Sequence, residues 1–265
     1  MTISESEIIP YYPSFPPGNR VLVLAPHPDD ETLGCGGAIR LYAESKKDIK
    51  VVFLTSGDKA DPSHRLSQQA FQKPHITDYS LMREREAEKA LHILGVADYE
   101  FLRFPDRGLA AHRAEAGELL LKIADGFRPD IVYSPSMIEL NPDHRTAAGL
   151  AIELQKAMRP ADNDGTPFSL IFYEVTTPLR PNLLVDVTPV YEKKKKALKE
   201  YRSQLKLTDY LGHIVALNEM RTLTISSVRK RGWRYVKNCR YAEAYWIADR
   251  LMTDEYIFRW LSYRL

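Results

Sequence analysis

Residues 27–31, with the sequence His-Pro-Asp-Asp-Glu, place an imidazole and two adjacent carboxylates directly after a short apolar segment. That segment, Val21–Ala25, is typical of a buried parallel strand. Because Pro28 restricts His27 to an extended conformation, the strand should end in a turn, followed by a helix over Glu31–Tyr42. The imidazole and the carboxylates therefore lie at the carboxyl end of a strand, where open α/β sheets carry their functional sites.

A second imidazole arises in a matching position further along the chain. Residues Ile131–Pro135 predict another buried strand, and Asn141–Arg145 (Asn-Pro-Asp-His-Arg) opens a helix predicted over Thr146–Met158. Either segment alone fits ordinary turn and cap chemistry, because His-Pro, Asp-Asp and Asn-Pro are common in turns and at helix starts. Two such segments in matched strand–loop–helix settings favour a functional site.

Two neighbouring parallel strands would bring His27, Asp30 and His144 together. Crowded imidazole and carboxylate groups need a cation between them, and nitrogen and oxygen ligands suit Zn2+. Three protein ligands with an open position for water are the pattern of a catalytic zinc site. Asp29 would then remain to act as the general base.

Shorter motifs accompany these two segments in order between Arg20 and Trp246. They are Thr55–Asp58, Arg83–Glu86, Phe104–Leu109, Tyr173–Val175, Pro181–Asp186, Lys196–Gln204 and Tyr241–Ala244. With them the chain resembles the zinc hydrolases of the GlcNAc-phosphatidylinositol de-N-acetylase-like (PIG-L/LmbE-like) family. The resemblance implies zinc on His27, Asp30 and His144, with Asp29 as base. It also implies that Arg83 and Asp106 face the substrate.

One position departs from the family pattern. Many relatives carry a histidine where this chain has Asn141, and that histidine is held to stabilise the oxyanion or to protonate the leaving amine. An amide can donate a hydrogen bond to an oxyanion, but it cannot carry charge or deliver a proton. We therefore expect protonated Asp29 to serve as the acid. Asp143 is expected to orient His144 or a neighbouring residue from behind the metal.

The resemblance implies a zinc-dependent deacetylase that converts an N-acetylglucosamine-type sugar or glycoconjugate into acetate and a free amine. The alternative is a zinc-containing sugar-binding protein that has lost turnover through Asn141, although the presence of Asp29 argues against it. A nucleotide-binding domain is disfavoured, because Gly34–Gly37 lies too far past the strand end and the third glycine of the fingerprint would fall at Ile39. The small residues there instead predict close packing of the helix on the sheet.

The elements that position these residues alternate between strands and helices. Further strands are predicted over Lys50–Thr55, Tyr99–Arg103, Leu170–Val175 and Leu183–Val187, and further helices over Ser80–Leu94, Glu115–Ala124, Pro189–Gln204 and Tyr210–Met220. This alternation predicts a Rossmann-like α/β fold, with a mostly parallel sheet and helices on both faces. We expect an N-terminal extension over residues 1–19 and a single deacetylase domain over residues 20–265, including a C-terminal helical segment.

Composition and charge exclude several other classes of protein. The chain has 265 residues, a hydrophobic share of 44% and a formal net charge of +2, which suits one globular domain and gives no argument for nucleic acid. It has no run of eighteen apolar residues for a transmembrane segment and no basic region before an apolar core for a secretory signal. Two cysteines do not make a disulfide framework. We therefore expect a cytoplasmic protein.

Two further segments carry surface predictions. The basic run Lys193–Lys196 is flanked by Glu192 and Glu200 and is interpreted as a solvated helix face. The aromatic, amphipathic segment Tyr256–Tyr263 should dock on the core or on a second subunit, which would make the protein a homo-oligomer.

Overall fold

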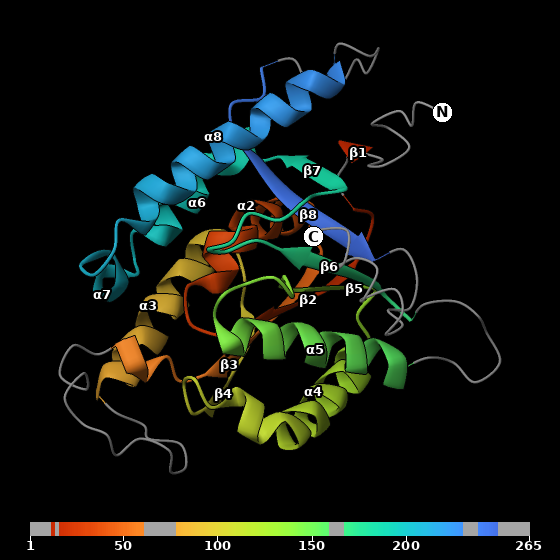
Figure 1. Ribbon diagram of the computed structural model, residues 1–265, viewed down its shortest axis with the longest axis vertical. Coiled ribbons are helices and arrows are strands. Elements are labelled where there is room, and N and C mark those ends of the chain that lie inside the picture. Colours follow the sequence, from red (N-terminus) through yellow and green to blue (C-terminus); the bar gives the residue numbers. More distant parts are fainter. Residues whose placement is uncertain (1–11, 14–15, 61–77, 159–166, 230–237, 249–265) are drawn as a thin grey trace.

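The central sheet is built from short apolar runs, most of them covered on both sides. The computed structural model describes residues 12–13, 16–60, 78–158, 167–229 and 238–248 of the chain. Within this part, eight strands form one sheet in the order β1-β7-β8-β6-β5-β2-β3-β4 (Figure 1). They are β1 (Tyr12–Pro13), β2 (Arg20–Ala25), β3 (Asp48–Thr55), β4 (Asp98–Phe104), β5 (Ile131–Pro135), β6 (Ser169–Tyr173), β7 (Leu183–Asp186) and β8 (Ala242–Ala248).

Helices cover both faces of this sheet (Figure 1). In β2, Val21, Val23 and Ala25 point into one apolar layer, and Leu22 and Leu24 point into the other. Burial on both faces is expected of a central parallel strand, and the Rossmann-like fold class is confirmed. The first layer includes α2 (Asp30–Glu44), α3 (Asp78–Leu94), α6 (Tyr191–Leu198) and α8 (Tyr210–Arg229), and the second includes α4 (Arg113–Phe127) and α5 (Pro142–Ala157).

The order of the strands creates a switch point beside β2. This strand pairs in parallel with β3 on one side and with β5 on the other. The chain runs outward from β2 to β3 and β4 on one side, and from β5 to β6 on the other. The carboxyl ends of β2 and β5 are therefore neighbours, as expected from the two motifs, and they form the crevice in which α/β sheets bind ligands.

Some parts of the fold differ from the sequence-based prediction. Strands β1 and β8 were not predicted; β1 pairs in parallel with β7, and β8 lies antiparallel between β6 and β7. The helix predicted over Pro189–Gln204 is wrong as a single element. It divides into a 3-10 turn, η4 (Thr188–Val190), the helix α6 and the short helix α7 (Arg202–Leu205). Elsewhere in the described residues, short 3-10 turns are η1 (Asp58–Ala60) and η3 (Leu109–His112).

Helix α2 is kinked at Cys35, where φ is −139° and ψ is 20°. A kink leaves backbone amides without their helical acceptors. Glu243 of β8 satisfies two of them, because its carboxylate accepts hydrogen bonds from the backbone nitrogens of Gly37 (2.7 Å) and Ala38 (2.8 Å). The last described strand thus fixes the helix that begins at Asp30.

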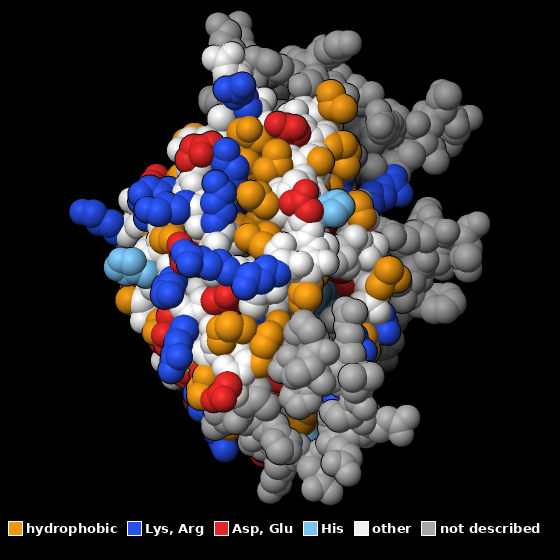
Figure 2. Space-filling model, turned by 90° about the vertical axis from the view of Figure 1, so that its left-hand side faces the viewer, with side chains coloured by type: hydrophobic (Ala, Val, Ile, Leu, Met, Phe, Trp, Pro, Cys, Tyr) orange, Lys and Arg blue, Asp and Glu red, His pale blue; other side chains and the backbone are white. Residues whose placement is uncertain are grey.

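The same carboxylate forms a buried ion pair with Lys194. The Nζ atom of Lys194 lies 2.6 Å from Glu243 Oε1, and the lysine side chain is 1% exposed. The interpretation of Lys193–Lys196 as a solvated face is therefore wrong for Lys194, although Lys193 and Lys196 are exposed. Figure 2 views this side of the molecule and shows Lys and Arg side chains spread over it, with hydrophobic ones between them.

The glycines of α2 pack as expected. An added Cβ atom would lie 2.1 Å from the Tyr173 ring at Gly34 and 2.5 Å from the Val187 side chain at Gly37, which no side chain can tolerate. Close approach of α2 to the sheet thus explains these glycines.

No helix in the described part of the chain is both long and apolar enough to cross a bilayer. The aromatic segment Tyr256–Tyr263 lies outside the described residues.

Candidate metal centre and active site

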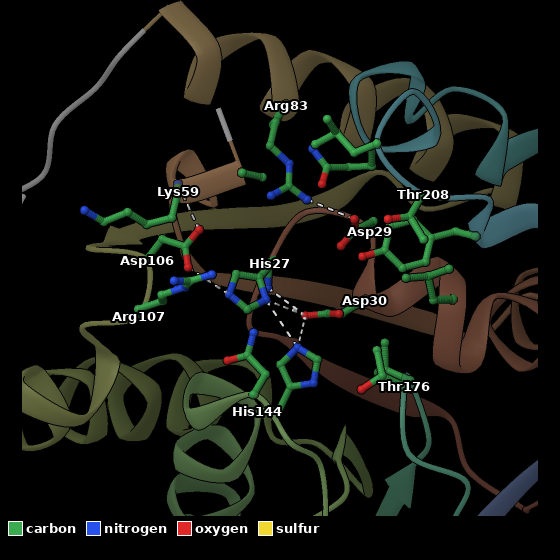
Figure 3. A pocket seen from close by; sticks show the side chains of 17 residues that line it. His27, Asp29, Asp30, Lys59, Arg83, Asp106, Arg107, His144, Thr176 and Thr208 are labelled. Carbon is green, nitrogen blue, oxygen red and sulfur yellow. Dashed lines mark hydrogen bonds and ion pairs between the residues drawn. The ribbon is translucent and has the colours of Figure 1, made fainter. Parts of the chain in front are cut away.

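The residues predicted to bind metal meet at the switch point. His27 follows β2, Asp30 begins α2, and His144 lies in the first turn of α5. Their side chains converge from these three segments (Figure 3). All three residues are buried, so the cluster is shielded from bulk water. Two motifs more than a hundred residues apart in sequence therefore form one site.

The facing atoms of this cluster have the spacing of a zinc site. Asp30 Oδ2 lies 3.1 Å from His27 Nδ1 and 3.1 Å from His144 Nε2, and the two nitrogens are 3.3 Å apart. Ligands bonded at about 2.0 Å to a tetrahedral zinc ion are about 3.3 Å from one another. Burial lowers the pKa of His144, but Asp30 and Glu139 outweigh it and raise that pKa to about 9. The cluster therefore has the donors, the spacing and the excess negative charge that a cation requires.

The other ring nitrogen of His27 faces two carboxylates. His27 Nε2 lies 3.3 Å from Asp106 Oδ1 and 3.4 Å from Asp143 Oδ2. Asp143 also accepts the backbone N–H groups of Arg107 (2.6 Å) and Leu109 (3.2 Å), and Asp106 accepts that of Lys59 (3.0 Å). These carboxylates are thus fixed behind His27. Of the two partners considered for Asp143, the structure places the neighbour His27 against it, and not His144.

His144 has a carboxylate behind it as well, which the sequence analysis missed. Glu139 Oε2 lies 3.7 Å from His144 Nδ1, the ring nitrogen that faces away from His27 and Asp30. The Glu139 side chain is buried and accepts backbone N–H groups of Val175 (2.7 Å), Thr176 (3.2 Å) and Thr177 (3.2 Å). Since these partners belong to the loop after β6, no local spacing in the sequence could have revealed the arrangement.

We expect Glu139→Gln to lower zinc affinity about 10- to 100-fold, the range found when a carboxylate behind a metal-bound histidine is lost. A carboxylate holds the N–H tautomer that presents Nε2 to the metal, and an amide does so poorly. Competition with a chromophoric chelator measures the effect. Thr176→Val is the matched control, because it removes a hydroxyl donor to Glu139 (2.6 Å) and leaves His144 alone. Equal zinc affinity in Glu139→Gln and the unaltered protein would limit Glu139 to anchoring the loop.

Asp29 occupies a constrained position beside the metal cluster. Its φ angle is 135°, in the region that residues other than glycine avoid, and the buried Glu31 accepts its backbone N–H at 3.2 Å. Burial raises the pKa of Asp29 to about 7, against the opposing effect of Arg83. A carboxylate with a pKa near neutrality suits a group that must both take and return a proton.

Arg83 reaches the site from α3 and is 2% exposed. Its Nη2 atom lies 3.0 Å from Asp29 Oδ2, and the guanidinium also donates to the carbonyl oxygens of Gly57 (2.8 Å) and Pro28. Arg83 lines the pocket, as does Asp106. The structure thus brings both residues to the site, where Arg83 holds Asp29 and Asp106 holds His27; contact with substrate stays a prediction for both.

Asn141 combines the two roles weighed for it. It is the N-cap of α5, and its Oδ1 atom accepts the backbone N–H of Asp143 at 2.8 Å. It also lines the pocket. Because the oxygen is used for capping, the NH2 group is the part of the side chain left to donate toward a ligand.

A pocket of about 650 Å³ opens over the cluster. Its polar wall contains the site residues together with Lys59, Arg107, Thr176, Gln204 and Thr208, and its apolar wall contains Leu33, Val175, Leu207 and Tyr210. A cavity of this size holds one or two sugar rings. The mixed lining suits a sugar, which has both hydroxyl groups and apolar ring faces.

Sequence comparison shows which known proteins the chain is similar to. The model of the family described as GlcNAc-PI de-N-acetylase (PIG-L) matches residues 22–154, which is half of the chain. The chain is 29% identical over 234 residues to the diacetylchitobiose deacetylase of Thermococcus kodakarensis, covering 84% of this chain and 82% of the relative.

Solved structures extend the likeness over most of the fold. The N,N'-diacetylchitobiose deacetylase from Pyrococcus horikoshii, complexed with its inhibitor, superimposes with a TM-score of 0.68 at 25% identity, covering 88% of this chain and 84% of that one. The 4-carboxy-2-hydroxymuconate hydratase from Pseudomonas putida gives a TM-score of 0.69 at 26% identity, covering 89% and 98%. The fold therefore accommodates both amide hydrolysis and hydration in related proteins.

Proposed function

The chain belongs to the GlcNAc-PI de-N-acetylase (PIG-L) family, and on this premise we propose that it is a zinc-dependent amidohydrolase. It removes the N-acetyl group from an N-acetylglucosamine-type sugar or glycoconjugate and leaves acetate and a free amine. The observation that carries this proposal is the convergence of His27, Asp30 and His144 at zinc-ligand spacing, with the carboxylate of Asp29 in the same pocket.

The residues of the chain divide the work as follows. His27, Asp30 and His144 would hold a zinc ion, which would supply a Lewis acid to acidify water and polarise the acetamide carbonyl. Asp29 takes the proton of the attacking water. Arg83 donates to Asp29 Oδ2, which leaves Oδ1 for that proton. Protonated Asp29 then returns the proton to the amine nitrogen as the C–N bond breaks.

Asn141 supports the developing oxyanion with its NH2 group. We expect Asn141→Ser and Asn141→Ala each to lower kcat for acetate release about 100-fold, the usual effect of removing one oxyanion donor. Because serine also caps helices, only Asn141→Ala should lower the melting temperature as well. Steady-state kinetics at saturating zinc, with thermal unfolding on the same samples, separate the two roles. An unchanged kcat in the serine variant would reduce Asn141 to a cap.

Acetate release from N-acetylglucosamine and its short oligosaccharides by the zinc-loaded protein tests the proposal. Acetate production that stops on chelation and returns with zinc supports it. Sugar binding without acetate would instead favour the sugar-binding alternative, which the relatives do not support because they are named as enzymes.

Hydration of a carbon–carbon double bond is the second candidate, favoured by the likeness to the hydratase over 89% of the chain. Such a reaction also needs an activated water and a group that moves protons. Loss of the ultraviolet absorbance of a conjugated, unsaturated dicarboxylate, without acetate release from any N-acetylated sugar, would identify this activity in place of the first.

A further inference from the structure

Arg107 is held in a backbone conformation that an arginine seldom adopts. It follows Asp106 in a turn closed by a hydrogen bond from the Gly108 nitrogen to the Pro105 oxygen (2.9 Å), and its φ angle is 61°. A turn with a positive φ at this position usually has glycine or asparagine there. A strained residue that persists beside an active site points to a use for its side chain.

Two other arginines of the described chain share this left-handed conformation, and both have internal partners. Arg103 (φ 58°) is paired with Glu84 at 2.7 Å, and Arg128 (φ 55°) is paired with Asp125 at 3.1 Å. The exposed guanidinium of Arg107 has no ion pair with any residue that the structure describes. It lies in the pocket wall with His27 and Asp106 (Figure 3).

The carboxylates of the pocket are already engaged elsewhere. Asp29 is paired with Arg83, Asp30 lies between the two histidines, and Asp106 faces His27 and the backbone of Lys59. With a divalent cation bound at the metal cluster, the described side chains that line the pocket beside Arg107 carry a net positive charge. A guanidinium binds carboxylate or phosphate with two parallel hydrogen bonds, so an anionic ligand group would complement it.

We propose that Arg107 binds an anionic group, a carboxylate or a phosphate, on the same substrate whose acetamide is cleaved. The enzyme therefore prefers acidic N-acetylated sugars to neutral ones. This inference rests on the proposed function and narrows its substrate class. The strained backbone at Arg107 persists because the arginine side chain is needed to bind the anionic group.

The test compares kcat/KM of the zinc-loaded protein for three substrates: N-acetylglucosamine, which is neutral, N-acetylmuramic acid, which carries a carboxylate, and N-acetylglucosamine 6-phosphate. The unaltered protein should favour at least one acidic sugar, and that advantage should shrink as salt is added. Arg107→Gln should lower kcat/KM about 10- to 100-fold for the favoured acidic sugar only, the scale of a lost charge-assisted hydrogen-bond pair. The favoured acidic sugar identifies carboxylate or phosphate.

Two glycine variants separate this role from a structural one. Arg107→Gly should abolish the preference without lowering the melting temperature, because glycine adopts the positive φ freely. Arg128→Gly makes the same change at the same backbone conformation outside the pocket and should keep the preference.

Equal use of all three sugars by the unaltered protein, or an equal loss on all three in Arg107→Gln, overturns the inference. If acetate is released from none of the three sugars, the proposed function is wrong instead. Calorimetric binding of the same sugars then decides the inference alone: acidic sugars that bind more tightly than the neutral one, and only while Arg107 is present, support it, and equal binding rejects it.

Discussion

Asp29→Asn should keep zinc bound and lower kcat for acetate release by at least about 100-fold, the lower end of what a general base contributes. The amide matches the carboxylate in shape, so the strained backbone at φ 135° and the metal cluster should persist. It cannot accept the proton of water, and it has no acidic proton to give to the amine. Zinc content and single-turnover acetate release on the same sample measure the two effects separately.

Asp30→Asn is the contrasting variant, because Asp30 Oδ2 is the atom that both histidines face. The first effect of Asp30→Asn should be a loss of zinc affinity. A variant set in which Asp29→Asn releases the metal and Asp30→Asn retains it would reverse the two assignments.

The pH dependence of kcat should also show that Asp29 acts as the base. Asp29 acts as a base only when it is deprotonated, and burial raises its pKa to about 7 in the protein without a cation. The acidic limb of kcat should therefore fall as the pH drops below about 7, and a nearby cation should move this limb to lower pH. The limb should disappear from the residual activity of Asp29→Asn.

His144→Ala should lower zinc affinity by more than about 100-fold, beyond the effect of losing a supporting carboxylate, because it removes one of three ligands. Acetate release should fall with zinc occupancy and recover partly at high zinc concentration. Metal analysis after dialysis against a weak chelator gives the occupancy. His213→Ala is the matched control, since His213 is exposed on α8 and does not line the pocket. Full zinc content in His144→Ala would place the metal elsewhere.

The sequence could locate the site because its motifs combine two local signals. Val21–Ala25 and Ile131–Pro135 are apolar runs of strand length, and each ends in residues that stop a strand and start a helix. The carboxyl ends of parallel strands lie at one edge of a sheet, so the sequence alone was enough to place His27 and His144 together. Their residue types suggested a metal site, the resemblance implied the same ligands, and only the substrate-facing roles of Arg83 and Asp106 rested on the resemblance alone.

Other parts depend on contacts that no local pattern contains. Strand β8 gains its place by pairing with β6 and β7, which are distant in sequence. Glu139 is fixed by backbone amides of another loop, and backbone amides are present at every residue except proline. Lys194 looks like its exposed neighbours until Glu243 is placed beside it. Long-range pairing decides each of these cases.

The position of Glu243 late in the chain has a consequence for biosynthesis. Ribosomes release a protein from its N-terminus, so a growing chain holds both metal-binding motifs once His144 has emerged. At that stage the second half of α2 lacks the Glu243 carboxylate that accepts its backbone N–H groups. Glu243 is synthesised about a hundred residues later, as part of β8. The metal ligands are thus synthesised well before Glu243, the residue that fixes the helix carrying Asp30.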